Sequence, residues 1–345
     1  EVFLMKRTLI LLLNITMLYM VLCSCDQPVD NTIEIPSPEV TAGGEAISTH
    51  GKGEDTTIPS DEGDKIKGGS EGVSYDNVAV VLDTVVDVFR EPDITSERVT
   101  QAIFNQPVTI LEEKDSWVKV KVVDGYTGWL RSKYIDRDCS SIMKENFTDK
   151  AVVTEKTQKV YSGAGGGVTL KDVVMGTELY IKNKKDRYFE VVLPGNITGW
   201  IETKGTIKVP VESPIPKTSA QDFLATVKKF METQYLWGGV SAWQGLDCSG
   251  LVYICSRING VNLPRDADMQ YDFIKTGPQN TGGLKPGDLL FFSSNEDLAN
   301  VSHVGIYLGE DQFIHASQSA GKVTYGSINS EYYKKRLKGI RRIFE

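Results

Sequence analysis

Short alternating runs of apolar and polar residues fill the middle of the chain, and a helical pattern replaces them after a proline-rich stretch. The run Trp117-Val118-Lys119-Val120-Lys121-Val122 is typical of a half-buried β-strand. Similar runs recur across residues 77–209 between glycine-containing turns, which predicts an all-β region. Residues 210–217 contain three prolines and are predicted to be a linker. A helix is predicted to begin near Ser219, with one apolar face made of Phe223, Leu224, Val227, Phe230 and Met231.

The β-rich region contains an internal repeat. Three pairs of segments match at offsets of 71 or 72 residues: Val88-Phe89 with Val160-Tyr161, Trp117 with Tyr188, and Thr127-Gly128-Trp129-Leu130 with Thr198-Gly199-Trp200-Ile201. Each unit is long enough for one small barrel of short strands. We therefore predict two all-β barrels, at residues 76–140 and 148–209.

The N-terminal residues have the pattern of an export signal. Lys6 and Arg7 precede an apolar stretch at residues 9–22, which is short for a membrane span. The run Leu22-Cys23-Ser24-Cys25 resembles a bacterial lipobox, which predicts a lipoprotein signal peptide over residues 1–25, translation from Met5 and lipidation of Cys25. An uncleaved anchor helix or an ordinary signal peptide also fits. Each alternative places the protein outside the cytoplasm.

Charge is concentrated behind this signal. Residues 26–75 hold eleven acidic residues and three lysines, which accounts for the formal net charge of −8. Their Gly, Pro, Ser and Thr content predicts a disordered acidic tether. The remaining chain is nearly neutral, so nothing indicates nucleic-acid binding. Five cysteines show no disulfide framework, and Cys139 is interpreted as a spare thiol in a polar linker.

A cysteine at the predicted start of a helix is the first candidate for chemistry. Asp247 is suited to cap a helix that begins at Cys248. The helix would then bury Leu251, Ile254, Cys255 and Ile258. The positive end of the helix dipole favours a thiolate, so we expect a lowered pKa for Cys248. A buried structural cysteine fits the same pattern.

Two of the three histidines follow Cys248 on neighbouring predicted strands. Residues 302–308 contain His303, residues 312–316 contain His315, and the residues between them form a predicted hairpin turn. One imidazole could deprotonate the thiol while the other orients the first. Two structural histidines at a sheet edge would also fit. A metal site is less well supported because the ligand set lacks a nearby acid or second cysteine.

The pairing of these strands decides whether the histidines meet. If Leu308 pairs with Gln312, His315 lies opposite Gly305. His303 is then the diagonal neighbour of His315 on the same face. A slip of one residue would place the two rings on opposite faces of the sheet.

With these residues in view, the last third of the chain resembles the NlpC/P60 family of peptidoglycan cysteine peptidases. The matching segments occur in the family's order: Tyr235-Leu236-Trp237-Gly238-Gly239, Leu246-Asp247-Cys248-Ser249-Gly250, Leu263-Pro264-Arg265-Asp266, Pro286-Gly287-Asp288-Leu289-Leu290-Phe291-Phe292, Ser302-His303-Val304-Gly305-Ile306-Tyr307 and Phe313-Ile314-His315-Ala316. The two β-rich units resemble bacterial SH3-like domains. The predicted fold is therefore multidomain, with two all-β SH3-like barrels followed by an α+β, papain-like peptidase domain at residues 218–345.

The resemblance implies a role for each candidate residue. Cys248 would attack the carbonyl of a D-glutamyl γ-amide, His303 would act as general base and then acid, and His315 would orient His303. The backbone N–H of Cys248 would stabilise the oxyanion. Tyr235 matches the family tyrosine that lies over the site. No cofactor and no metal are implied.

The tandem SH3-like units narrow the resemblance to the γ-D-glutamyl-L-diamino-acid endopeptidases that act on stem peptides with a free N-terminal L-Ala. In that subgroup, a glutamate and a tyrosine of the first SH3-like domain bind the substrate amine. Glu91 and Tyr126 occupy the matching positions. Further substrate-binding positions are matched by Asp247, Ser249, Asp266 and Ala267. Ala267 stands where the family often has serine, so one polar contact is open to question.

Three classes of function remain at this point. The favoured one is an endopeptidase for peptidoglycan stem peptides, monomeric and held at the bacterial cell envelope by a lipid anchor. An N-acetylmuramoyl-L-alanine amidase or another wall hydrolase of the same fold is the second. A non-catalytic, wall-binding lipoprotein is the third, and the intact Cys-His-His set argues against it.

Overall fold

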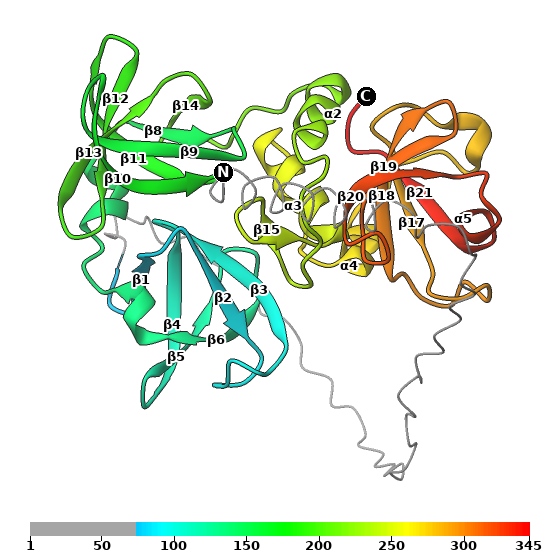
Figure 1. Cartoon of the computed structure of the whole chain (residues 1–345), viewed down its shortest axis with the longest axis horizontal. Helices are drawn as coiled ribbons and strands as arrows, with labels where there is room; N and C mark the ends of the chain where they lie inside the picture. Colours follow the sequence, from blue (N-terminus) through cyan, green and yellow to red (C-terminus); the bar gives the residue numbers. More distant parts are fainter. Residues whose placement is uncertain (1–73) are drawn as a thin grey trace, which may run out of the picture. The chain divides into compact units, whose positions relative to one another are not determined.

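The computed structural model describes residues 74–345, which lie within one compact unit (Figure 1). The predicted signal peptide, Cys25 and nearly all of the predicted tether lie outside these residues. Two antiparallel β-sheet regions are followed by an α+β region, as the sequence predicts. The exact domain boundaries stay a prediction. Among residues 74–345, no helix has the length and apolar character needed to cross a membrane.

The first β region is a seven-stranded sheet in the order β3-β2-β6-β5-β4-β1-β7. Its strands are β1 (Val78–Val81), β2 (Val85–Phe89), β3 (Arg98–Ile103), β4 (Pro107–Lys114), β5 (Trp117–Lys121), β6 (Thr127–Arg131) and β7 (Ile135–Asp136). Short 3₁₀ turns follow: η1 (Ser132–Tyr134), η2 (Ser140–Ile142) and η3 (Lys144–Asn146). The sheet encloses its own apolar core, to which several strands contribute alternate residues: Ala79 and Val81, Val86 and Val88, and Val118 and Val120.

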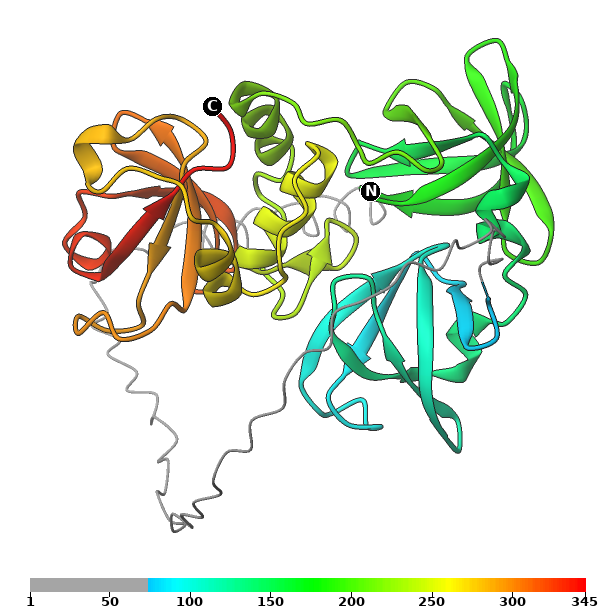
Figure 2. The same cartoon turned by 180° about the vertical axis from the view of Figure 1, so that it is seen from behind.

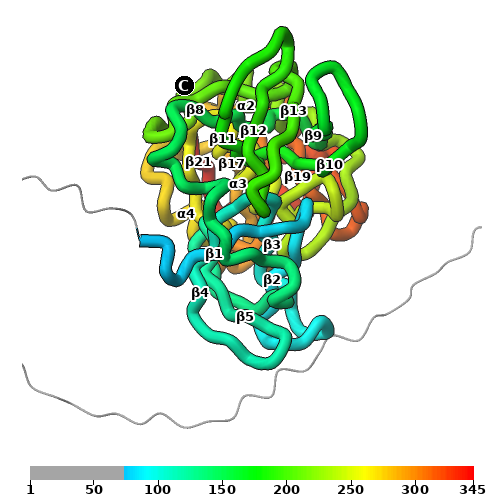
Figure 3. Tube along the Cα trace, turned by 90° about the vertical axis from the view of Figure 1, so that its left-hand side faces the viewer, coloured from blue at the N-terminus to red at the C-terminus, as the bar shows by residue number. Residues whose placement is uncertain are grey.

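The second β region repeats the first, strand for strand. Its order is β10-β9-β13-β12-β11-β8-β14, which is the first order shifted by seven strands. Its strands are β8 (Asp149–Val153), β9 (Thr157–Gly163), β10 (Gly166–Val174), β11 (Glu178–Lys185), β12 (Tyr188–Leu193), β13 (Ile197–Glu202) and β14 (Thr206–Pro210). The two regions form separate groups of strands in Figure 3, cyan and green. Their shared topology is the structural form of the sequence repeat.

The Thr-Gly-Trp segment of each repeat shows why its glycine is needed. A Cβ atom on Gly128 would lie 2.6 Å from the carbonyl oxygen of Phe89, and one on Gly199 would lie 2.5 Å from a methyl group of Val160. Both distances are too short for any larger residue. The glycine lets the neighbouring strand, β2 or β9, approach closely in each region.

The third region places helices beside an antiparallel sheet (Figures 1 and 2). Its helices are α2 (Ala220–Lys228), α3 (Cys248–Ile258), α4 (Ala267–Phe273) and α5 (Glu331–Arg336), with a 3₁₀ turn η4 (Thr281–Gly283). The sheet has the order β20-β19-β18-β17-β21. Its strands are β17 (Leu289–Phe292), β18 (His303–Gly309), β19 (Gln312–Ser317), β20 (Lys322–Ser327) and β21 (Leu337–Arg341), and a separate hairpin pairs β15 (Val240–Ser241) with β16 (Gly245–Leu246).

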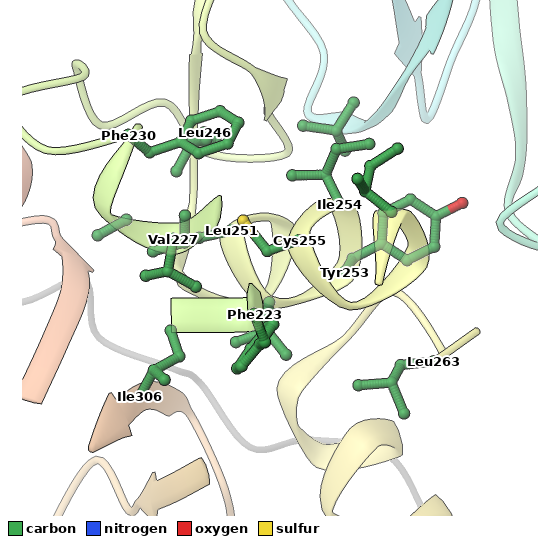
Figure 4. Close-up of a cluster of buried hydrophobic side chains, with 14 of the residues drawn as sticks. Phe223, Val227, Phe230, Leu246, Leu251, Tyr253, Ile254, Cys255, Leu263 and Ile306 are labelled. Atoms are coloured by element: carbon green, nitrogen blue, oxygen red, sulfur yellow. The ribbon is translucent and has the colours of Figure 1, made fainter. Parts of the chain in front are cut away.

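Helix α3 is the central element of this region because it packs against α2 on one side and against β18 and β19 on another. Figure 4 shows its buried side chains, including Cys255, among the apolar residues of α2 and the sheet. Cys255 is fully buried. Its surroundings are those of a structural cysteine.

Three sequence predictions differ from the structure. The predicted helix at Ser219 begins there with a capping box, but it ends at Lys228, so Phe230 and Met231 lie beyond it. The sequence predicts a polar connection where helix α4 lies, and it does not predict strands β15, β16, β20 and β21 or helix α5. Cys139 is not a spare thiol in an open linker: it is 3% exposed and packs with Val80 and Ile142.

Candidate active site

The first turn of α3 presents Cys248 as its first residue. Asp247 caps the helix, and its Oδ1 accepts a hydrogen bond of 2.7 Å from the N–H of Gly250. The Cys248 side chain is nearly buried, and the residue lines a cavity of about 1050 Å³. Cys248 therefore lies at the start of a capped helix, as the sequence predicts.

A buried arginine holds the cap in place. Arg265, which is 1% exposed, donates through Nη1 and Nη2 to the two carboxylate oxygens of Asp247 at 2.9 and 2.7 Å. The same guanidinium donates to Oγ of Ser249 and to the carbonyl oxygen of Gly239, both at 3.0 Å. The residues on both sides of Cys248 are thus fixed by one side chain. Arg265 lies in a matched family segment, but its function could not be read from the sequence.

The two histidines meet on adjacent strands. Ile306 pairs with Ile314 and Tyr307 with Phe313, in the register that the sequence predicts. At the turn, Gly309 rather than Leu308 pairs with Gln312, and an irregularity between Tyr307 and Gly309 absorbs the difference. Away from the turn the register is unchanged. His303 Nε2 and His315 Nδ1 consequently lie 2.7 Å apart.

The thiol lies beside this pair. The backbone N–H groups of Val304, which follows His303 in β18, and of Ser249 lie close enough to the Cys248 sulfur to lower its pKa. Cys248, His303 and His315 all line the same cavity. The structure therefore brings the three predicted catalytic residues together.

Burial sets the protonation of all three groups. Burial, followed by the nearby Asp247 carboxylate, raises the pKa of Cys248 to about 12. Burial, followed by the charge of His315, lowers the pKa of His303 to about 3, and burial lowers that of His315 to about 4. The expectation of a lowered thiol pKa is wrong for the unliganded protein, because desolvation outweighs the helix dipole and the two N–H donors. The resting site is a neutral thiol beside neutral imidazoles.

Most of the predicted substrate-binding residues line the cavity as well. They are Tyr126, Tyr235, Asp247, Ser249, Asp266 and Ala267. The hydroxyl of Tyr126, in the first β region, donates to the Asp266 carboxylate in the α+β region. This contact joins the two regions at the cavity, which both residues line. Burial, followed by that hydrogen bond, raises the pKa of Tyr126, so the phenol stays protonated.

Glu91 is the exception among the predicted residues. It is exposed at the start of a turn in which the Ser96 hydroxyl bonds to its backbone, and it is not among the residues that line the cavity. The carboxylate of this turn that lines the cavity is Glu97. Glu97 accepts hydrogen bonds from Arg90 and from the indole N–H of Trp237, the latter at 3.1 Å. Its charge is therefore already paired.

Helix α5 adds two tyrosines that the sequence did not indicate. Tyr332 and Tyr333 line the cavity, and the Tyr333 ring lies 5.5 Å from that of His315 and 6.4 Å from that of His303, measured between centroids. Burial raises the pKa of Tyr333 to about 12.

Comparison with known proteins agrees with this geometry. Residues 232–342 match the model of the NlpC/P60 family, and residues 88–135 match that of the bacterial dipeptidyl-peptidase SH3 domain. A gamma-D-glutamyl-L-lysine dipeptidyl-peptidase from Bacillus cereus is 28% identical over 263 residues, which cover 70% of this chain and 74% of the relative. A protein of the same name from Bacillus subtilis is 29% identical over 253 residues, which cover 71% and 81%.

A solved structure shows the same fold. The crystal structure of an NlpC/P60 family protein from Bacillus cereus matches with a TM-score of 0.71 at 24% identity, covering 78% of this chain and 100% of that one. The two SH3-like regions, the α+β region and the family matches all agree. The chain therefore belongs to the NlpC/P60 family of peptidoglycan peptidases and is a cysteine peptidase.

Proposed function

We propose that this protein hydrolyses the γ-D-glutamyl-L-diamino-acid bond of peptidoglycan stem peptides that carry a free N-terminal L-Ala. The observation that supports it most is the position of Cys248 at a capped helix start, beside two histidines joined by a contact of 2.7 Å. Relatives from two Bacillus species bear the name of peptidases for the γ-D-glutamyl-L-lysine bond.

His303 is the general base in this proposal. Its Nε2–H donates to Nδ1 of His315, a tautomer that we assign from the 2.7 Å contact. That hydrogen bond leaves Nδ1 of His303 as the proton acceptor for the thiol. Because the pKa of each imidazole is lowered, both rings are neutral at neutral pH and His303 is able to accept a proton.

The reaction then proceeds through an acyl-enzyme. The Cys248 sulfur bonds to the γ-carbonyl carbon of D-Glu as its proton passes to His303, and the carbonyl oxygen becomes an oxyanion. The C–N bond breaks, and His303 returns the proton to the leaving amine. Water, deprotonated by His303, cleaves the thioester and restores the thiol. The buried thiol loses its proton only as the bond forms, which agrees with its raised pKa.

The start of α3 supplies the oxyanion site. The first N–H groups of a helix have no hydrogen-bond partner within the helix. Asp247 accepts the hydrogen bond from one of them, the N–H of Gly250. Cys248 is the first helical residue, so its own N–H is available for an oxyanion formed at its sulfur. The helix dipole adds a favourable field at the same point.

The part of the cavity at Tyr126 suits a free amine. Asp266, in contact with Tyr126, and Asp268 line the cavity, and Arg90, which also lines it, is already paired with Glu97. An N-terminal ammonium would bind the Asp266 carboxylate, which Tyr126 orients. Since Glu91 does not line the cavity, we assign the amine to Asp266 rather than to Glu91. A stem still attached to muramic acid carries an amide there, without the charge.

The site of action is proposed from the N-terminal sequence. The lipobox-like run ending at Cys25 lies outside the described residues. Lipidation of that cysteine would hold the peptidase at the cell envelope, where its substrate occurs.

Product analysis tests the proposal. The full chain should convert L-Ala-γ-D-Glu-L-Lys, or its diaminopimelate counterpart, to L-Ala-γ-D-Glu and the free diamino acid, as identified by mass spectrometry. Cys248→Ala should abolish turnover, and Cys255→Ala, in the same helix but within the core, should keep it. Wild-type turnover by Cys248→Ala would reject the nucleophile. With the muramyl tripeptide as a second substrate, release of the intact tripeptide from muramic acid would identify an amidase instead.

A further inference from the structure

The loop that precedes Cys248 is bound on its outer side by the first SH3-like region. This loop, residues 237–246, runs from Trp237 through the β15–β16 hairpin and ends just before Asp247. Strand β3 of the first region lies against it. A Cβ atom on Gly238 would lie 2.6 Å from the carbonyl oxygen of Arg98 in β3. The backbones of the two regions are therefore in direct contact next to the active site.

One buried side chain makes the central polar contact across this interface. Gln101 of β3 is 2% exposed, and its Oε1 accepts a hydrogen bond of 3.0 Å from the N–H of Val240. Its Nε2 donates to Asp87 at 2.9 Å and to Gln244 at 2.6 Å. Val240 is 4% exposed, so its N–H would be buried without a partner if Gln101 were removed. The side-chain amide of Gln101 thus provides the hydrogen-bond partner for a buried backbone N–H of the peptidase region.

The inner side of the same loop holds the cap of α3. The N–H of Gly238 donates to Oδ2 of Asp247 at 2.9 Å, and the N–H of Asp247 donates to the carbonyl oxygen of Gly239 at 3.3 Å. That carbonyl oxygen also receives Nη2 of Arg265. Any shift of residues 238–240 therefore moves Asp247, and with it the helix start that carries Cys248.

We infer that Gln101 is a positioning residue for Cys248, so that the first SH3-like region builds the nucleophile's site as well as closing the cavity. Gln101 does not line the cavity. It acts through Val240, Gly239 and Asp247. A side chain that only closed the cavity over the substrate would change substrate binding, whereas Gln101 sets the geometry of the thiol itself.

The inference deepens the proposed function, and its test has an arm that needs no peptide substrate. In the full chain, Gln101→Met removes all three polar contacts of the Gln101 amide at nearly constant volume. The matched control is Gln158→Met in β9 of the second SH3-like region, where the side chain amide donates to the carbonyl oxygens of Glu202 and Lys204. Alkylation of Cys248 by iodoacetamide, read by peptide mapping across a range of pH, reports the thiol directly. Hydrolysis of L-Ala-γ-D-Glu-L-Lys gives kcat and KM.

Misplacement of a reacting group by a fraction of an ångström lowers turnover strongly, so kcat of Gln101→Met should fall roughly 10- to 100-fold while KM changes less than about twofold. The alkylation profile of Cys248 should shift along the pH axis or fall in rate. Gln158→Met should match the wild type in both readouts. Gln101→Met with wild-type alkylation and kcat, or with a change in KM alone, would overturn the inference.

A second variant covers the case in which Gln101→Met does not fold. Gln244 is exposed and is the other partner of the Gln101 amide, so Gln244→Ala removes one contact without a change in the core. It should slow Cys248 alkylation and kcat in the same sense, by roughly two- to tenfold, which is the range for the loss of one neutral hydrogen bond. A wild-type alkylation profile in Gln244→Ala would then count against the inference. If neither the wild type nor the variants cleave the tripeptide, but the alkylation profile of Cys248 shifts as expected, the proposed function fails and the positioning role of Gln101 stands.

Discussion

Removal of Arg265 should strongly destabilise the start of the active-site helix. The Arg265 side chain is 1% exposed and that of Asp247 10%, and they share a two-point contact. In Arg265→Met, the Asp247 carboxylate would stay buried with only the N–H groups of Gly238 and Gly250 and the Ser249 hydroxyl as donors. Breaking a buried ion pair on one side typically costs about 3–5 kcal/mol of unfolding free energy.

The structure also predicts how a second change should act. Asp247→Asn alone leaves the guanidinium of Arg265 unpaired and should cost a similar amount, about 3–5 kcal/mol. In the double variant neither charge remains, so its cost should be well below the sum of the two single costs. The thiol gives a second readout, because Arg265 lowers the pKa of Cys248 and Asp247 raises it. Alkylation of Cys248 in the Arg265→Met chain should therefore require higher pH.

Urea unfolding of the wild type, Arg265→Met, Asp247→Asn and the double variant, followed by circular dichroism, measures the coupling between Arg265 and Asp247. A matched control is Arg342→Met, which removes a partner of the buried Asp288 away from the catalytic cavity, and which should destabilise the chain without changing Cys248 alkylation. Additive costs in the Arg265→Met and Asp247→Asn cycle would refute the reasoning. So would a loss of less than about 1 kcal/mol in Arg265→Met, since that is the size expected of an exposed pair.

Three further outcomes are expected. Asp266→Asn should lower kcat/KM for a free-amine tripeptide by roughly tenfold or more, since a charge-assisted hydrogen bond is lost, whereas Glu91→Gln should leave it within about twofold; equal effects in paired kinetics would reject the assignment of the amine. The unfolding free energy should fall as pH drops below 6.5, because the folded imidazoles of His303 and His315, with lowered pKa values, bind fewer protons than the unfolded ones. Urea unfolding at about pH 4.5 and about pH 7 measures this dependence, and His315→Gln should make it weaker. A pH dependence that His315→Gln leaves unchanged would contradict its assignment to the histidines. Cys25→Ala should move the protein from the membrane to the soluble fraction and abolish labelling by palmitate, and labelling equal to wild type would show the lipidation prediction to be wrong.

The repeat and the nucleophile could be predicted because each rests on local patterns. Segments 71 or 72 residues apart led to two sheets of identical strand order. The acid, glycine and apolar spacing around Cys248 identified the helix start. The histidine register was also correct, because the irregularity beside Leu308 is confined to the turn and leaves the Ile306–Ile314 pair in place.

What could not be predicted depends on contacts between distant segments. The position of Glu91 in the chain says nothing about which side chain of its turn reaches the cavity, and Glu97 lines it instead. The raised pKa of Cys248 follows from burial, which a helix-start pattern does not reveal. Gln101 lies on a strand whose partners are set by the packing of two regions, so no spacing in the sequence identifies it.

Labelling of Cys248 by a substrate-like reagent tests the central claim most directly. A diazomethyl ketone of L-Ala-γ-D-Glu places its ketone where the scissile carbonyl would lie and its reactive diazomethyl carbon where the leaving nitrogen would lie. The account predicts that it modifies Cys248 alone, as found by peptide mapping, and abolishes hydrolysis. The N-acetylated reagent, which lacks the ammonium, should react at least about tenfold more slowly. Modification at another residue, or equal rates for the two reagents, would contradict the account.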